Sequence, residues 1–217
     1  MLLLTIDTAG VMRTTCALAR GIDDWIGVTV PLSPAEALAP AIEDLLQKFG
    51  CASNDISDVV CGIGPGPFTG LRIGLAHAHA VAQVLGITPS GVSSLAAIAA
   101  RVPQAMRPER YLVASDARRK EVYCAVFDSS ASMIGPPQVI TPAVAAEQFA
   151  GLLVVGDGAK VYSEVFTAAG CAIADDEQLL SCEQALVMAA HDAVKRGPVP
   201  ALPEYMREPD AVPTAAR

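Results

Sequence analysis

The same succession of sequence patterns occurs in the first half of the chain and again in the second half. In each half an apolar segment ends at an aspartate, Asp7 or Asp116, and a second apolar segment follows after a turn. A Ser-Pro or Thr-Pro pair then starts a helix, and an apolar strand after it ends in a Gly-x-Gly turn, at 62–64 or 156–158. Recurrence of a whole succession is typical of an internal duplication, so we expect two domains of related fold.

The spacing of apolar residues assigns an element type to each segment. Strands are predicted over 2–6, 14–19, 25–30, 58–63, 111–114, 121–127 and 152–155. Helices are predicted over 33–49, 69–85 and 184–194. Ser33, Thr69 and Thr141 fit N-caps, with Glu36 as the capping-box partner of Ser33, and Pro40 should bend or restart the first helix.

Short antiparallel strands followed by helix–strand units predict an α/β fold, in which each half forms a mixed sheet flanked by helices. Two such tandem domains resemble the ribonuclease-H-like, actin-like architecture of actin, sugar kinases and Hsp70. We assign 1–106 to the first domain and 107–217 to a second, smaller domain whose C-terminal tail returns toward the first. In that architecture nucleotide lies in the cleft between the halves. The candidate residues for binding it are Asp7, Asp116, Gly156 and Gly158.

The glycine-rich segment 62–75 joins a strand to a helix and admits two interpretations. Free backbone N–H groups at the helix start would bind an anion, although no Lys-Ser or Lys-Thr pair follows as in a P-loop. The glycines would alternatively permit tight packing of neighbouring backbone. The following helix is rich in small residues between Gly70 and Ala82, so it is either an ordinary core helix or one shared with a partner.

Charge and composition restrict the function classes. The net charge is −8 and 52% of residues are hydrophobic, so a principal surface for nucleic acid is not expected, because phosphate contacts need Lys and Arg. The six cysteines form no CxxC pair and the three histidines have no metal-binding spacing. We therefore expect reduced thiols, no metal site, no membrane segment and a cytoplasmic location. No His or Lys is spaced to activate a hydroxyl, so no catalytic residue is predicted.

Four segments resemble the TsaB (YeaZ) family of bacterial tRNA threonylcarbamoyladenosine biosynthesis proteins. They are LTIDTA at 4–9, GPGPFTGLRIG at 64–74, DARRKEVY at 116–123 and YMREPDA at 205–211. Two positions depart from the family pattern. Members usually carry Ser where Pro67 stands, and they often have a His-Ser or His-Thr pair where this chain has Ser33 and Pro34.

The resemblance implies a non-catalytic subunit that binds the catalytic protein TsaD. With the ATPase TsaE it would support transfer of a threonylcarbamoyl group to adenosine 37 of ANN-decoding tRNAs. It implies contact with tRNA through the complex, no cofactor of its own, and ATP or ADP at the complex interface. Members also form homodimers through the surface that binds TsaD, which is built from the first two helices. Carried over, that surface comprises Leu38, Ile42, Leu45, Leu71, Gly74, Leu75, His77 and Ala78.

Other interpretations stay open. The basic cluster of Arg118, Arg119 and Lys120 is expected at a turn, where it either contacts tRNA phosphate or an acidic partner or is solvated. The chain could instead be a small independent ATP-dependent enzyme of the actin and sugar-kinase fold. An M22-type glycoprotease is the third alternative, for which the metal ligands are missing. The proline-rich tail should be extended and cross other elements, anchored by Tyr205 and Arg207.

Overall fold

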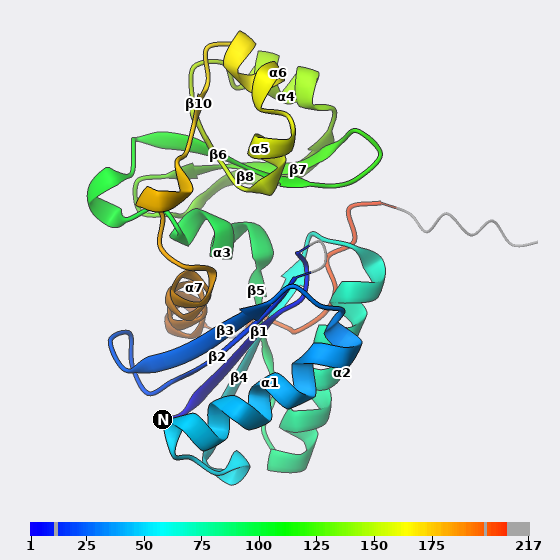
Figure 1. Ribbon diagram of the computed structural model, residues 1–217, viewed down its shortest axis with the longest axis vertical. Helices are drawn as coiled ribbons and strands as arrows, with labels where there is room; N and C mark the ends of the chain where they lie inside the picture. Colours follow the sequence, from blue (N-terminus) through cyan, green and yellow to red (C-terminus); the bar gives the residue numbers. More distant parts are fainter. Residues whose placement is uncertain (11–12, 198, 208–217) are drawn as a thin grey trace, which may run out of the picture.

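The structure, a computed structural model that describes residues 1–10, 13–197 and 199–207, has two α/β domains stacked along its long axis (Figure 1). The first contains a five-stranded mixed sheet with the strand order β3-β2-β1-β4-β5. Its first three strands pair antiparallel, and β4 and β5 continue the sheet parallel to β1. The strands are β1 (Leu3–Asp7), β2 (Thr14–Ala19), β3 (Trp25–Val30), β4 (Asp58–Gly64) and β5 (Ser90–Ser93).

The second domain repeats this sheet. Its order is β10-β9-β6-β7-β8, which matches the first sheet when β6 to β10 are aligned with β1 to β5. The directions of pairing also match. The strands are β6 (Arg110–Asp116), β7 (Val122–Asp128), β8 (Met133–Ile140), β9 (Leu153–Val155) and β10 (Ala172–Ile173). The predicted α/β class, with two tandem actin-like domains, is confirmed.

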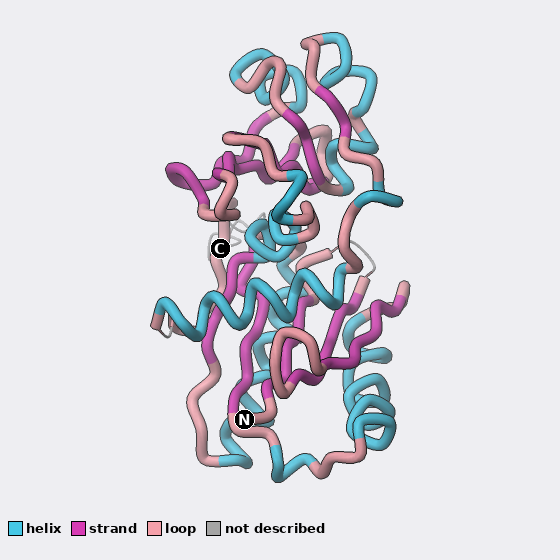
Figure 2. Tube along the Cα trace, turned by 90° about the vertical axis from the view of Figure 1, so that its left-hand side faces the viewer, coloured by secondary structure: helices cyan, strands magenta, loops and turns pink. Residues whose placement is uncertain are grey.

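Helices cover both faces of the first sheet. On one face α1 (Pro34–Phe49) and α2 (Phe68–Leu85) pack against Leu4 and Ile6 of β1. On the other face α7 (Cys182–Arg196) packs against Leu3, as the alternation of side chains along a strand requires. Figure 1 shows α7 end-on, and Figure 2 shows it lengthwise across the strands. The last helix of the range 107–217 thus packs on the sheet of the first domain.

A short helix, α3 (Ser94–Ala100), lies between the two sheets (Figure 1). Its Ala97 joins the core formed with α7, and its Leu95 joins the core of the second domain beside Tyr111 and Phe127. The outer face of the second sheet is covered by α4 (Pro142–Gln148), α5 (Asp157–Val161) and α6 (Ser163–Ala168). Three 3-10 turns complete the fold, η1 (Ser53–Asp55), η2 (Gln104–Met106) and η3 (Asp176–Gln178).

The helix starts differ in part from the sequence prediction. Thr141 caps α4 as expected, since its side chain accepts a hydrogen bond from the Val144 N–H at 3.4 Å. Ser33 stands at the N-cap of α1 but makes no side-chain cap bond, so the predicted capping box is wrong. The α1 helix continues through Pro40 without a restart. The prediction that Thr69 caps α2 is also wrong, because the helix begins at Phe68 with Pro67 at its N-cap.

The described part of the tail crosses the first domain as predicted. The Gly91 N–H donates to the Val199 carbonyl at 2.7 Å, and the Glu204 N–H donates to the Ile63 carbonyl at 2.7 Å. The tail thereby follows β5 and β4 toward the start of α2. The end of the 205–211 motif and the rest of the tail, 208–217, lie outside the described residues.

All six cysteines are free, and four of them are buried. Burial raises the pKa of Cys16 to about 12 and that of Cys124 to about 11. These thiols are therefore inert core side chains. Within the part of the chain that the structure describes, no helix is long and apolar enough to cross a membrane.

Candidate functional site

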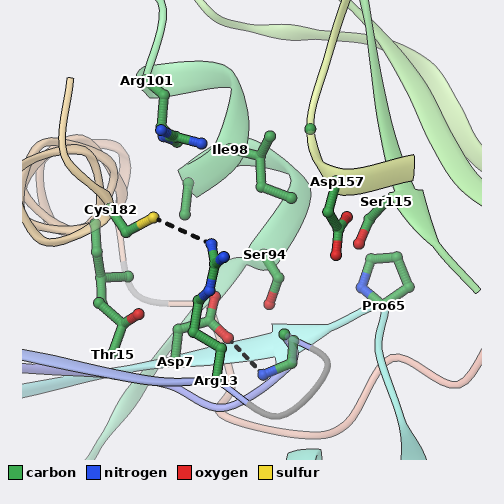
Figure 3. Close-up of a pocket in the computed structure, with 15 residues that line it drawn as sticks. Asp7, Arg13, Thr15, Pro65, Ser94, Ile98, Arg101, Ser115, Asp157 and Cys182 are labelled. Carbon is green, nitrogen blue, oxygen red and sulfur yellow. Dashed lines mark hydrogen bonds between the residues drawn. The ribbon is translucent and has the colours of Figure 1, made fainter. Parts of the chain in front are cut away.

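The two domains enclose a cavity of about 110 Å³ where the ends of β1 and β6 approach each other (Figure 3). The starts of α3, α5 and α7 complete its walls. The polar side chains that line it are Asp7, Arg13, Thr15, Ser94, Arg101, Ser115, Asp157 and Cys182. The internal duplication therefore brings the first turn of one half and the Gly-x-Gly turn of the other to the same place.

Asp7 ends β1 at the floor of this cavity. Its Oδ1 accepts a hydrogen bond from the Ala9 N–H at 2.7 Å. Strand β4 passes directly beside the carboxyl group, because a Cβ added at Gly62 would lie 2.6 Å from the Asp7 Cγ. Burial raises the pKa of Asp7, and the Ala9 N–H and the neighbouring Ser94 hydroxyl oppose that effect. The carboxyl group is thus held in a desolvated position that favours a donor or a cation beside it.

The nucleotide-site candidates of the second half do not all lie at the cavity. Gly156 lines the cavity, whereas Asp116 and Gly158 are not among its described lining residues. The Asp116 carboxylate turns away, accepting a bond from the Arg118 N–H at 2.9 Å. Asp157 provides the carboxylate at the cavity instead. Its Oδ1 accepts from the Asp116 N–H at 3.1 Å and from the Gly158 N–H at 3.0 Å, which ties the start of α5 to the end of β6.

Four further cavity residues could not be found from the sequence, because they come from separate elements and carry no motif. Arg13 reaches across the cavity, and its Nη1 lies 3.6 Å from the Cys182 Sγ at the start of α7. Arg101 donates to the Leu180 carbonyl at 3.0 Å and pairs with Asp176 at 3.3 Å. Ser94 is 4% exposed, and its hydroxyl lies beside the Asp7 carboxyl group without a well-aligned hydrogen bond.

A second cavity of about 460 Å³ adjoins the first and shares Arg13, Arg101, Asp157 and Cys182 with it. Its outer wall adds Lys160 and residues of both charge signs. The inner cavity is well below the roughly 300–1,000 Å³ of a typical drug-sized ligand site. Among the described residues, no group of three or more His, Cys, Asp or Glu side chains is placed to hold a metal ion. The chemistry of the inner cavity therefore suits a small polar ligand.

The glycines of the segment 62–74 let α2 pack against the turn after β1. A Cβ added at Gly66 would lie 2.6 Å from the Ala9 carbonyl oxygen, and one at Gly70 would lie 2.5 Å from that of Thr8. One at Gly74 would lie 2.2 Å from the Thr8 Oγ1. Such distances exclude any side chain, so the geometry supports the packing interpretation of this motif. Anion binding by its backbone stays a prediction.

The start of α2 also anchors the tail. The rings of Phe68 and Tyr205 lie 4.9 Å apart, and the Arg72 guanidinium lies 3.6 Å from the Phe68 ring centre. The Arg72 Nε–H donates to the Tyr205 hydroxyl at 2.8 Å. Arg207 donates to the Ala117 carbonyl at 2.8 Å and pairs with Glu121. The predicted anchoring by Tyr205 and Arg207 is confirmed, and it links segments that the sequence singled out separately.

Comparison with known proteins identifies this combination of motif and fold. A family model described as "TsaD: tRNA N6-adenosine threonylcarbamoyltransferase" matches residues 34–191. An uncharacterized protein of Mycobacterium tuberculosis is 35% identical over 98% of this chain and 94% of its own length. The tRNA threonylcarbamoyladenosine biosynthesis protein TsaB of Escherichia coli is 29% identical over 95% of both chains. The structure of YeaZ from Pseudomonas aeruginosa superposes with a TM-score of 0.78, at 28% identity, over 94% of this chain and 99% of that one.

The chain belongs to the TsaB (YeaZ) family. Its departure at Pro67 is accommodated by the backbone, since Pro67 has a φ of −58° at the N-cap of α2, within the range that the proline ring imposes. A serine at this position would be able to cap the helix through its hydroxyl. In this chain α2 has no side-chain cap.

The residues carried over as the TsaB partner surface lie in the chain's own core. The buried ones are Leu38, Ile42, Leu45, Leu71, Gly74, Leu75 and Ala78. The prediction that these seven contact a partner is therefore corrected, because their periodic stripe is the face of α1 and α2 that the sheet covers. His77 is half-buried, and burial lowers its pKa. A partner would reach other residues of the same helices.

The basic cluster lies at the exposed turn between β6 and β7, as predicted. Arg118, Arg119 and Lys120 all have left-handed backbone, with φ of 61°, 54° and 60°. Three consecutive non-glycine residues in that region are strained. The contacts of Arg207 hold the two ends of the turn at Ala117 and Glu121. Contact of this turn with tRNA or an acidic partner stays a prediction.

Proposed function

We propose that this chain is a cytoplasmic, non-catalytic subunit of the system that places N6-threonylcarbamoyl on adenosine 37 of ANN-decoding tRNAs. The observation that carries the proposal is the match along nearly the whole chain to a protein named for this pathway. Its direct partner would be TsaD, with TsaE and the tRNA bound through the complex. The chain would need no cofactor of its own, and ATP or ADP would bind at the interface with TsaD.

The cleft supports a non-catalytic role. Among the described residues that line the inner cavity there is no histidine or lysine. The Ser94, Ser115 and Cys182 side chains therefore have no nitrogen base beside them there.

The outward face of α2 is the docking surface that we propose for TsaD. Ile73, Ala76, Ala80 and Val84 follow helical spacing along it. Ala76 and Ala80 are exposed and small, which lets a partner helix approach closely. Val84 is 84% exposed, the highest value among the exposed large apolar side chains of the described residues. Docking a partner here would cover it.

The test compares two exposed valines. Val84→Glu on α2 is expected to weaken co-purification with TsaD at least about tenfold, as removal of a central interface contact does. Val161→Glu on α5 is the matched control, because Val161 is 60% exposed on the second domain, and its variant should bind TsaD as the unchanged chain does. Equal binding by both variants would show that α2 is not the interface.

Depletion of the chain in its own organism tests the function itself. Mass spectrometry of tRNA nucleosides should show loss of threonylcarbamoyladenosine, restored by the unchanged gene and not by the Val84→Glu variant. Unchanged levels after depletion would refute the pathway assignment. The same surface could bind a second copy of the chain. The oligomeric state of the Val84→Glu variant is therefore measured beside its TsaD binding, so that loss of self-association and loss of TsaD binding are told apart.

A further inference from the structure

The inner cavity contains a buried hydroxyl group that makes no well-aligned hydrogen bond. Ser94 is 4% exposed and lines the cavity at the start of α3. Its Oγ lies beside the Asp7 carboxyl group but makes no well-aligned hydrogen bond in the described structure. Figure 3 shows this oxygen pointing into the space around which Asp7, Arg13 and Asp157 are arranged. A buried hydroxyl group without a well-aligned hydrogen bond is costly, so a ligand or ordered water is expected beside it.

The cavity also carries an acidic and a basic side chain, Asp7 and Arg13, without an ion-pair partner among the described residues. Asp7 accepts one backbone hydrogen bond and forms no ion pair within the described structure. Arg13 contacts the Cys182 thiol, and no carboxylate pairs with it among the described residues. Cys182 is the first residue of the 15-residue helix α7. The positive end of the helix dipole therefore lies on the same side as the Arg13 guanidinium.

These features select the charge type of a ligand. An anion alone would meet Arg13 favourably, but the Asp7 and Asp157 carboxyl groups that also line the cavity would disfavour it. A cation alone would be repelled by Arg13. A molecule that carries both charges a few bonds apart would pair with Asp7 and with Arg13. It would also have to be small, because the cavity volume of about 110 Å³ corresponds to only a few water molecules at roughly 30 Å³ each.

We propose that this cavity binds a small zwitterion of α-amino-acid size. Its carboxylate would accept hydrogen bonds from Arg13 at the start of α7, and its ammonium group would donate to Asp7. The Ser94 hydroxyl would bond to either group and so gain a well-aligned partner. The site differs from the α2 surface proposed for TsaD, so it does not depend on the proposed function.

L-serine is a suitable probe, and the assay is titration calorimetry with the purified full-length chain. L-serine should bind at least about tenfold more tightly than ethanolamine or propionate, which each lack one of the two charges. Inorganic phosphate and ATP complete the series. Stronger binding of phosphate or ATP than of L-serine would overturn the zwitterion assignment, and so would absence of L-serine binding at about 10 mM.

Two variants locate the site. Arg13→Gln should weaken L-serine binding about tenfold or more through loss of a charge-assisted bond, and Ser94→Ala about two- to tenfold. Arg110→Gln, an exposed arginine at the start of β6, is the control and should bind as the unchanged chain does. Thermal melts verify that each variant is folded. Wild-type affinity in both Arg13→Gln and Ser94→Ala would refute the site.

Cys182 supplies an independent reporter of occupancy. It lines the cavity and is only partly buried, and Cys51 is the other partly buried thiol. In a Cys51→Ser background, saturating L-serine should slow alkylation of Cys182, and ethanolamine should not. If L-serine binds without any effect on Cys182 alkylation, it binds elsewhere and the proposal fails.

Discussion

Gly74 offers the sharpest test of why the glycine-rich segment has its composition. It lies on α2 directly against Thr8, in the turn that follows β1. A Cβ added at residue 74 would lie 2.2 Å from the Thr8 Oγ1 and 3.3 Å from the Thr8 Cβ. The same Thr8 hydroxyl donates to the Gly70 carbonyl at 2.8 Å. Gly74→Ala therefore forces Thr8 to rotate or α2 to move, and either change breaks that hydrogen bond.

Three contributions set the size of the effect. Alanine in a helix interior is more favourable than glycine by about 1 kcal/mol. An extra methyl group in a packed interior costs about 1–3 kcal/mol, and loss of the Thr8 hydrogen bond costs about 1 kcal/mol. The balance is a loss of about 1–3 kcal/mol in the free energy of unfolding, opposite in sign to what helix propensity alone predicts.

Urea unfolding followed by circular dichroism measures this difference, and a double-mutant cycle with Thr8→Ala assigns its cause. Removing the Thr8 hydroxyl and methyl groups opens the space, so Gly74→Ala should cost much less in that background. Gly21→Ala is the control, because nothing lies within 4 Å of a Cβ there, and it should change stability by less than about 0.5 kcal/mol. The reasoning is refuted if Gly74→Ala stabilises the chain, or if its cost is the same with Thr8 and with alanine at position 8.

Two other changes test the floor of the cavity and the tail. Because burial raises the pKa of Asp7, the native state binds the proton of this carboxyl group more tightly than the unfolded state does. Asp7 therefore favours folding at acidic pH, and this contribution to stability is lost as the pH rises. Asp7→Asn should accordingly raise the melting temperature at pH 7, with the gain shrinking toward about pH 4; a gain independent of pH would contradict this. Tyr205→Phe removes the hydrogen bond that Arg72 donates, so the free energy of unfolding should fall by about 0.5–1.5 kcal/mol. The Glu204 amide, which binds the Ile63 carbonyl, should then exchange its hydrogen faster. An unchanged exchange rate would show that the Tyr205 hydroxyl does not hold the tail.

The sequence predicts most of the first sheet because its strands and turns carry local signals. Strands 14–19 and 25–30 occur with the predicted bounds, and Gly50 ends α1 in left-handed conformation. The recurrence of patterns also predicts correctly that both halves share one topology. These results depend on local periodicity and turn chemistry, which a single sequence contains in full.

The wrong or missing predictions concern which surfaces of the elements contact each other. The stripe containing Leu38 and Leu75 has the same helical period whether it faces a sheet or a partner, so periodicity could not show that the chain's own sheet covers it. No sequence pattern predicts that α7 lies across the first sheet, because α7 comes after the strands of the second domain in the chain. Ser94 and Cys182 meet in the cleft only because α3 and α7 both begin there.

The cleft also shows how the duplicated halves have diverged at equivalent positions. Asp7 and Asp116 both end the first strand of their sheet, but only Asp7 faces the cavity. Asp116 instead holds the basic turn through Arg118, and the cavity carboxylate of the second half comes from Asp157 in the Gly-x-Gly turn. The equivalent turn of the first half has Ile63 at its centre, and its flanking Gly62 leaves room for Asp7. One half thus presents a desolvated carboxyl and the other a carboxylate already bound by two N–H groups, so a ligand in the cleft would take its main acidic contact from the first half.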